Sequence, residues 1–395
     1  MSSTVARHSR HSESSKAERR SSGNHRRRRI LAAEDAICDT VVIVPARNEE
    51  SGVLMALDSL AGQTHPPDLI LVVVNNSTDR TEEYAREFAA RPGVPVTEVL
   101  NLPVNPHKKA GALNFGIRWL VESAAGGLAG AARYLLVMDA DTSMHHQFIA
   151  RARRVAESDP RIGGVSATCL GRTDLWNSPW QRYLTGMQII EYGRYAHSRY
   201  RSTVHSMSGA GSFYRTEALQ SLLNWRGEVF WEDDANLVED YETTLALKES
   251  GWKVTANQLC VAYTDLMPTL RELVQQRERW GRGTVDTLRQ RGWTRFTWFS
   301  ILTIVMGFVG FAYTAGWGLV SMGIIARRGL LFDPVWFSLM AFWSIYAGFR
   351  VRHLGWKAIL VEFVLIPELV FAMVRNYWLL SSVVKSYFTR VSAWK

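Results

Sequence analysis

Two aspartates, Asp139 and Asp141, stand at the end of a short apolar run, RYLLVMD, at residues 133–139. Residues two apart in an extended strand point to the same side, so their carboxylates converge. Converging carboxylates repel each other unless a cation lies between them. Their hard oxygen atoms suit Mg²⁺ or Mn²⁺, ions that also bind substrate phosphates. The pair predicts a divalent-metal site, although two solvated aspartates at a strand end would give the same pattern.

A second group of acidic residues provides candidates for a general base. Residues 232–234 are Glu-Asp-Asp, and Glu239 and Asp240 open a helical pattern at 241–250. Acidic side chains in a first helical turn are also favoured by the helix dipole, so Glu239 and Asp240 could simply cap that helix. Residues 232–234 could equally form a solvated loop. Spacing alone leaves the choice of base between these clusters open.

The elements that must position these carboxylates are those of an α/β fold. Strands are predicted by three short apolar runs rich in β-branched residues, at 40–46, 69–75 and 133–139. The first two lead into helical patterns at 49–60 and 81–90. Strands that are apolar on both faces and alternate with helices imply a parallel sheet covered on both sides.

Polar segments follow each of these strands. In open α/β sheets, ligands bind beyond the carboxyl ends of the strands. The segments that meet at this edge are residues 47–49, 75–79 and 139–141. We therefore expect the binding site along that edge of the sheet.

Seven motifs follow one another between residues 40 and 283. They are VVIVPARNEE at 41–50, NNSTD at 75–79, KAGALN at 109–114, DAD at 139–141, SGAGSFYR at 208–215, VED at 238–240 and QRERW at 276–280. Together they resemble the family-two glycosyltransferases, particularly the membrane-embedded cellulose, chitin, hyaluronan and poly-N-acetylglucosamine synthases. The resemblance implies a GT-A fold, with a Rossmann-like, mostly parallel sheet, and a nucleotide-sugar donor.

The resemblance also implies roles for individual residues. Asp240 would be the catalytic base with Glu239 beside it, which decides the choice that spacing left open. The residues expected to contact the donor nucleotide are Pro45, Ala46, Asn48, Glu49, Asn75, Asp79, Lys109 and Asp139. Those expected on the acceptor and diphosphate side are Gly211, Gln276, Arg279 and Trp280. Asp141, helped by Asp139, would hold Mg²⁺ or Mn²⁺ as cofactor.

The implied reaction is a single displacement at the anomeric carbon, which inverts its configuration. Asp240 would take the acceptor hydroxyl proton, and Lys109 and Arg279 would add positive charge near the diphosphate. The sequence departs from the family where Asn75 replaces the usual Asp at the uracil contact, and where Val238 replaces the usual Thr. An asparagine can still accept a hydrogen bond there, but it carries no charge.

The run at residues 268–290 is predicted to be helical and to offer an acceptor platform. Gln276, Arg279 and Trp280 are spaced i, i+3 and i+4, so they share one helical face. We expect Trp280 to stack on the acceptor sugar. An interfacial helix anchored in lipid by Trp280 is the alternative.

The C-terminal third is predicted to form a membrane domain, residues 293–395. No charged residue occurs at positions 296–326, which as a helix would span roughly 46 Å, more than the ~30 Å of a hydrocarbon core. Two further apolar stretches, 330–349 and 358–374, give two to three transmembrane helices in total. The basic residues between these stretches place the catalytic domain, residues 37–292, in the cytosol, and the protein in the cell (inner or plasma) membrane.

Residues 1–36 are predicted to be a disordered basic tail. Residues 1–30 hold nine basic and two acidic residues, so they carry most of the net charge of +9. They contain almost no large apolar side chains and no apolar segment of a secretory signal. No specific nucleic-acid partner is expected, because the basic excess ends at Arg29 without interleaved aromatic residues. The three cysteines are far apart and predict neither a zinc site nor a disulfide.

These observations favour an enzyme that makes a β-linked polysaccharide from a nucleotide sugar, most simply a UDP-sugar. The expected partners are a nucleotide-sugar donor, a glycan or lipid-linked acceptor and membrane lipid, with a homo-oligomer or an export partner where a channel is needed. A single-addition enzyme acting on a lipid acceptor is the alternative. A non-catalytic sugar-nucleotide sensor is a different class, disfavoured because both metal aspartates and the candidate base are present.

Overall fold

The computed structural model describes residues 38–172, 178–198, 204–232, 237–328, 334–364 and 366–388. The predicted tail, residues 1–36, lies outside the described residues. Asp233 and Asp234, two of the acidic residues weighed as a general base, lie outside them as well.

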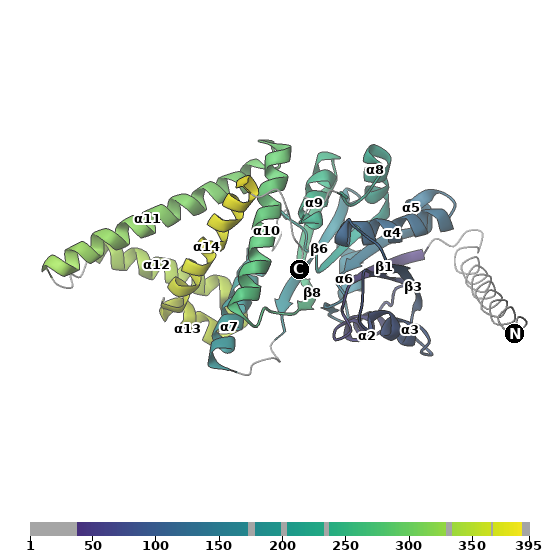
Figure 1. Cartoon of the computed structure of the whole chain (residues 1–395), viewed down its shortest axis with the longest axis horizontal. Coiled ribbons are helices and arrows are strands. Elements are labelled where there is room, and N and C mark those ends of the chain that lie inside the picture. Colours follow the sequence, from purple (N-terminus) through teal and green to yellow (C-terminus); the bar gives the residue numbers. More distant parts are fainter. Residues whose placement is uncertain are drawn as a thin grey trace, which may run out of the picture.

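An eight-stranded mixed sheet forms the centre of the larger lobe (Figure 1). Its strands are β1 (Cys38–Ala46), β2 (Leu69–Asn75), β3 (Val96–Leu102), β4 (Ala132–Met138), β5 (Ser143–Met144), β6 (Ile162–Gly171), β7 (Gly211–Arg215) and β8 (Lys253–Thr264). They lie side by side in the order β3-β2-β1-β4-β7-β6-β8-β5. The β3-β2-β1-β4 half is parallel, as the three apolar runs predicted.

The other half of the sheet departs from the predicted parallel arrangement. Strand β7 pairs antiparallel with both β4 and β6, and β5 pairs antiparallel with β8. Because β7 runs backwards, its amino end meets the carboxyl end of β4, where Met138 pairs with Gly211. The antiparallel strand thus carries the 208–211 turn to the edge where Asp139 and Asp141 lie.

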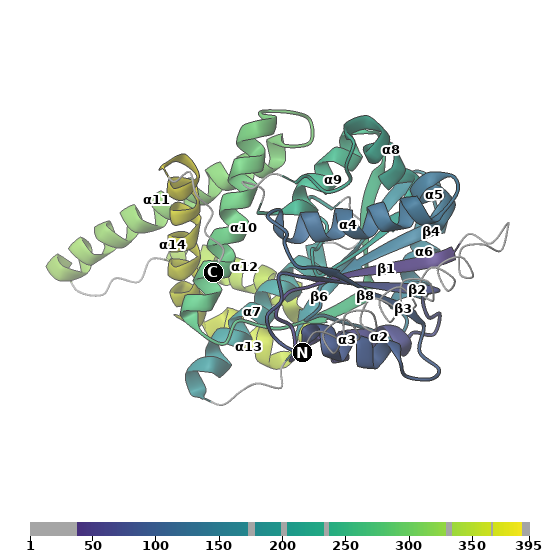
Figure 2. The same cartoon turned by 45° about the vertical axis from the view of Figure 1, so that its right-hand side comes forward.

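Helices cover both faces of the sheet (Figure 2). On one face lie α2 (Val53–Ala61), α3 (Thr81–Ala89) and α6 (Phe148–Glu157). On the other lie α4 (Lys108–Ser123), α5 (Gly127–Ala131), α8 (Thr216–Arg226) and α9 (Glu239–Glu249). Side chains of β1 alternate between the two resulting cores: Val42 packs into the first and Val41 into the second, and both are fully buried. A strand buried on both faces needs apolar residues at every position, which explains the continuous apolar run.

The remaining helices form a second group beside the sheet. They are α7 (Pro179–Ser198), α10 (Leu270–Arg291), α11 (Trp298–Arg328), α12 (Pro334–Val351), α13 (Trp356–Val364) and α14 (Ile366–Phe388), with the 3₁₀ turn η1 (Arg352–Leu354). Figures 1 and 2 show α10 standing between the sheet and the helices that follow it, with α14 alongside. Thr269 caps α10, since its hydroxyl oxygen accepts a 3.2 Å hydrogen bond from the backbone N–H of Glu272.

The C-terminal helices do not bear out the predicted membrane spans. Across the described part of the chain, no helix combines the length and the apolar character needed to cross a bilayer. Within the stretch at 358–374, the two acids pair with Arg194 of α7, Glu362 at 2.6 Å and Glu368 at 2.9 Å. The predicted localisation, an integral protein of the cell membrane with a cytosolic catalytic domain, is therefore wrong.

Candidate active site

Unusual backbone conformations mark three of the predicted donor-binding motifs. Asn48, Asn76 and Lys108 have φ values of 55°, 48° and 54°, and they are the non-glycine residues with positive φ in the described ranges. This left-handed region is sparsely populated by side chains other than glycine, and such residues gather at functional sites. All three lie at the edge of the sheet where the parallel strands end.

The loops after β1 and β2 are fixed to each other by side-chain hydrogen bonds. Asn48 accepts a 2.9 Å bond from the backbone N–H of Thr78, and Asp79 accepts a 3.0 Å bond from that of Glu50. Asp79 also accepts bonds from Thr81 at the start of α3. Burial would raise the pKa of Asp79, but these hydrogen bonds outweigh it and lower that pKa. Asn48 and Asp79 therefore hold the shape of the predicted nucleotide site.

Asn75 lies beneath these loops and is 4% exposed. Its amide nitrogen donates a 3.2 Å bond to the carbonyl of Ala46, and its amide oxygen accepts a 3.4 Å bond from Asn105. Pro45 and Ala46 lie on β1 in register with β2. An aspartate could not make the bond to Ala46, because a carboxylate has no donor. The departure from the family at this position is thus accommodated by a local hydrogen bond.

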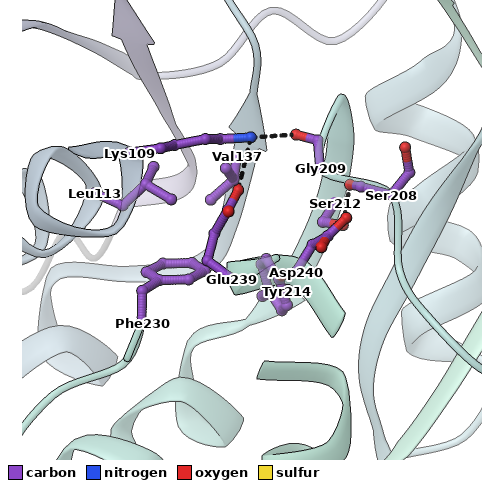
Figure 3. Close-up of a pocket in the computed structure, with 10 residues that line it drawn as sticks. All are labelled: Lys109, Leu113, Val137, Ser208, Gly209, Ser212, Tyr214, Phe230, Glu239 and Asp240. Carbon is purple, nitrogen blue, oxygen red and sulfur yellow. Dashed lines mark hydrogen bonds and ion pairs between the residues drawn. The ribbon is translucent and has the colours of Figure 1, made fainter. Parts of the chain in front are cut away.

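Lys109 lies between the DAD motif at 139–141, the predicted metal site, and the VED motif at 238–240, which contains the predicted base. Its Nζ lies 2.5 Å from Oδ1 of Asp139. It also lies 3.0 Å from Oε1 of Glu239 and donates a 3.0 Å bond to the carbonyl of Gly209 (Figure 3). Burial alone would lower the pKa of this lysine, but the two carboxylates outweigh it and raise that pKa well above its usual value. Lys109 is therefore a permanent cation at the centre of the site.

Asp240 lies beside this cation at the start of α9. Burial, and next the negative charge of Glu239, raise the pKa of Asp240 to about 6, although Lys109 opposes the shift. Burial also acts to raise the pKa of Glu239, but Lys109 outweighs it and the net shift is downward. The two adjacent carboxylates thus differ in proton affinity, which suits Asp240 to accept a proton and Glu239 to remain charged.

Gly209 closes one side of the pocket around Lys109 and Asp240 (Figure 3). A Cβ atom at Gly209 would lie 3.2 Å from Oδ2 of Asp240 and 3.2 Å from Nζ of Lys109. Gly211, the residue expected on the acceptor side, instead starts β7, and a Cβ there would meet Met144 and Ala167 at 2.7 and 3.0 Å. Of these two glycines, Gly209 is the one against the candidate base, and the sequence analysis did not single it out.

We therefore expect Gly209→Ala to lower turnover by about 10- to 100-fold, because a displacement of about 1 Å in reacting groups can cost that much. Gly186→Ala in α7 is the matched control, since a Cβ there meets no described atom within 4 Å. Steady-state kinetics of both variants test this expectation. Equal activity in the two variants would show that the space at Gly209 is not used in catalysis.

The carboxylates around Asp141 fit a divalent cation. Burial, then Asp139 and Asp265, raise the pKa of Asp141 to about 6. Burial together with Asp141 and Asp139 likewise raises the pKa of Glu49 to about 7. Several partly buried negative charges thus repel one another through space, and a cation near them would relieve the repulsion. Asp139 and Asp141 supply the hard oxygen ligands that Mg²⁺ and Mn²⁺ prefer.

The protein alone offers few ligands. Within the described ranges, no cluster of three or more His, Cys, Asp or Glu side chains is arranged to hold a metal. Mg²⁺ in proteins is commonly bound by one or two carboxylates together with substrate phosphates. The carboxylate oxygens of Asp139 and Asp141 are of the kind that the predicted Mg²⁺ or Mn²⁺ would need.

Arg172 and Asp265 are two further residues of this edge that the sequence analysis missed. Arg172, at the end of β6, donates a 2.8 Å bond to Asp265 and a 3.1 Å bond to the backbone carbonyl of Asp141. Asp265 follows β8. Only the pairing of β6 with β8 brings the two together, and no local motif indicates it.

The predicted acceptor-side helix α10 lies against Leu237 and Val238, which directly precede α9, the helix that carries Asp240. A Cβ at Gly283 would come within 2.9 Å of side-chain atoms of Leu237 and Val238, just before Glu239. The charge of Arg279 helps lower the pKa of Glu239, after the larger effect of Lys109.

Comparison with known proteins identifies the class. A model described as "Glycosyltransferase like family 2" matches residues 38–283, so the chain belongs to glycosyltransferase family 2. The fold agrees: a mannosyltransferase from Pyrobaculum calidifontis, solved in complex with GDP-Man and Mn²⁺, superposes with a TM-score of 0.59 at 19% identity. That match covers 90% of this chain and 88% of the other, and supports a GT-A-like α/β fold with a mixed sheet.

Three relatives of assigned activity are similar to part of the chain. The chain is 27% identical over 251 residues to an N-acetylglucosaminyltransferase of Rhizobium meliloti (strain 1021), covering 62% of this chain and 55% of that protein. It is 23% identical over 252 residues to a poly-beta-1,6-N-acetyl-D-glucosamine synthase of Staphylococcus epidermidis, covering 62% and 55%. It is also 28% identical over 208 residues to hyaluronan synthase 3 of Mus musculus, covering 50% and 36%. The chain thus spans about half the length, or less, of these relatives.

Proposed function

We propose that the protein is a metal-dependent, inverting glycosyltransferase that moves a sugar from a UDP-sugar to a glycan acceptor. The observation that carries this proposal is the placement of Lys109, which bonds both Asp139 and Glu239 next to Asp240. One cation thereby joins the donor side of the site to the candidate base. The names of the N-acetylglucosamine-transferring relatives make UDP-N-acetylglucosamine the first donor to test.

In this proposal the protein side chains do most of the positioning. Asp240 accepts the proton of the acceptor hydroxyl, whose oxygen attacks the anomeric carbon from the face opposite the leaving diphosphate. Lys109 and Arg279 place positive charge near that diphosphate. Asp139 and Asp141 would hold Mg²⁺ or Mn²⁺, which when bound offsets the charge developing on the leaving group. One displacement turns an α-linked donor into a β-linked product.

Chain extension is the finer part of the proposal. Trp280 is 37% exposed on α10, the helix that packs on the residues just before α9. An exposed indole at this position suits a platform for an acceptor sugar. The length of the product made from a short acceptor distinguishes chain extension from a single addition. A ladder of products supports extension, whereas one added sugar supports the alternative.

Nucleotide release tests the proposal as a whole. The purified protein is incubated with a panel of nucleotide sugars and Mg²⁺ or Mn²⁺, with and without excess EDTA. We expect release of UDP from at least one UDP-sugar, and none with EDTA. Binding of the same sugars without release in the presence of acceptor would instead support a non-catalytic sensor.

The activity should depend on pH through Asp240. The pKa of this base lies at about 6, above its ordinary value. Because the base must be ionised to accept a proton, kcat/KM, which reports the pKa of the free enzyme, should be level above that pH and fall by about tenfold or more per unit below it. A profile of kcat/KM between pH 4.5 and 8, with metal saturating, tests this. A kcat/KM that stays level down to pH 4.5 would contradict the assignment of the base.

A further inference from the structure

Arg277 lies inside the QRERW motif but was not assigned a role from the sequence. It is 5% exposed, and three neighbours surround its guanidinium group. That group donates a 2.7 Å bond to Glu191 of α7 and a 2.9 Å bond to Gln276, and its carbon lies 4.4 Å from the centre of the Trp280 ring. The guanidinium group therefore contacts two residues of the predicted acceptor site at once.

Packing of α7 against α10 does not by itself require this buried charge. The two helices already share an apolar cluster that includes Leu184, Met187, Ile190 and Leu273. A buried arginine is costly unless it is paired, and apolar replacements of such pairs are often no less stable. The Arg277–Glu191 pair is therefore better explained by what it does to Trp280.

A planar guanidinium group fixes an aromatic ring in a way that an apolar residue cannot. It stacks on the ring face while its N–H groups donate hydrogen bonds to other residues. The orientation of the ring relative to those residues is thereby fixed. Tyr192, next to Glu191, lies 5.4 Å from the same guanidinium carbon. The guanidinium group covers one face of Trp280, and Trp280 as a whole remains 37% exposed, so part of it is accessible to a ligand.

We propose that Arg277, held by Glu191, is a positioning residue that fixes the Trp280 ring as the platform for the acceptor sugar. This inference rests on the proposed function and adds two residues to its acceptor side. Ordering the ring before the acceptor arrives lowers the entropy cost of binding it. Loss of Arg277 or Glu191 should therefore change the KM for the acceptor more than the rate at which the donor is hydrolysed.

The test compares Arg277→Met, Arg277→Lys and Glu191→Gln with the wild type, using UDP-N-acetylglucosamine as donor and chitotetraose as acceptor probe. Arg277→Met should raise the KM for chitotetraose about tenfold while hydrolysis of the donor changes less than about twofold, since about 1.4 kcal/mol of lost acceptor binding is a factor of ten. Arg277→Lys should not restore the KM, because an ammonium group lacks the planar fork. Glu191→Gln should give a smaller rise, since an amide oxygen still accepts one bond.

Lys385→Met is the matched control. Lys385 of α14 pairs at 2.5 Å with Glu278, the residue next to Arg277 on α10. The control thus removes an ion pair from the same turn of the helix and leaves Arg277 with its bond to Glu191 and its contact with Trp280 in place. It should leave the KM for chitotetraose unchanged, and an equal rise in this variant would overturn the inference.

A double-mutant cycle decides whether Arg277 acts through Trp280. Adding Arg277→Met to Trp280→Ala should give no further rise in KM, because the platform is already gone. Effects that multiply, or a normal KM in both Arg277→Met and Glu191→Gln, would overturn the inference. If Arg277→Met fails to fold, Glu191→Gln carries the cycle. Failure of the proposed function would differ, since the wild type itself would then release no UDP from any nucleotide sugar.

Discussion

Replacing Asp141 by asparagine should abolish metal-dependent transfer. Asp141 and Asp139 supply the carboxylate oxygens that fit a divalent cation, and the amide of asparagine carries no charge to hold it. A bound metal contributes several kcal/mol to stabilising a leaving group, so its loss should cost about 10²-fold or more in kcat/KM. Nucleotide release measured across a titration of Mn²⁺ tests this. Full activity of the variant, or of the wild type in excess EDTA, would contradict the metal assignment.

Thermal unfolding provides a readout of Asp141→Asn that is independent of activity. The pKa of Asp141 is raised to about 6 in the folded protein, so at pH 7 its ionised form costs folding free energy, and this cost disappears as the pH falls below the unfolded value. The metal-free variant should therefore melt at the same temperature as the metal-free wild type or higher. Mn²⁺ with UDP should raise the Tm of the wild type but not that of the variant.

Replacing Asp240 by asparagine should lower turnover by about 10²–10⁴-fold, the usual contribution of a general base. Donor binding should change little, because Lys109 still bonds Asp139 and Glu239. The measurement pairs kcat with the Kd for UDP in the presence of Mn²⁺. Asp234→Asn tests the alternative general base, which the spacing of the acidic residues did not exclude. Loss of turnover in Asp234→Asn with normal turnover in Asp240→Asn would show that the base has been assigned to the wrong cluster.

The sequence predicted the parallel half of the sheet and the edge at which the site lies. That half is local: each apolar run is followed by a polar turn, and parallel strands place these turns at a common edge. The family resemblance assigned Asp139, Lys109, Glu239 and Asp240 to one candidate site, but it did not predict that Lys109 bonds both Asp139 and Glu239. These features depend on residues close together in the chain or on motifs with fixed roles.

Other features of the candidate site depend on contacts between segments far apart in the chain, and no local sequence pattern indicates them. The reversal of β7 brings Gly209 against Asp240, and the pairing of β6 with β8 brings Arg172 to Asp265. Arg277 carries the same charge as many surface arginines, and only the packing of α7 on α10 shows that it is buried. The pKa differences between adjacent carboxylates likewise arise from burial and neighbouring charges, which the order of residues does not reveal.

The apolar C-terminal third shows a different kind of error. Uniform apolar composition over residues 296–326 predicts a transmembrane helix, yet no helix in the described part of the chain is both long enough and apolar enough to cross a bilayer. The acids of the stretch at 358–374 pair with Arg194 of α7. Composition alone did not indicate the partner of these charged residues.

The anomeric configuration of the product tests the central claim most directly. The account requires one displacement, with Asp240 as the base and the diphosphate leaving from the opposite face. The protein is supplied with UDP-α-N-acetylglucosamine, Mn²⁺ and chitotetraose, and the new linkage is read from the anomeric proton coupling by NMR spectroscopy. We predict a β-linkage from the first turnover onward, absent in Asp240→Asn. An α-linked product would contradict a single displacement, and with it the role assigned to Asp240.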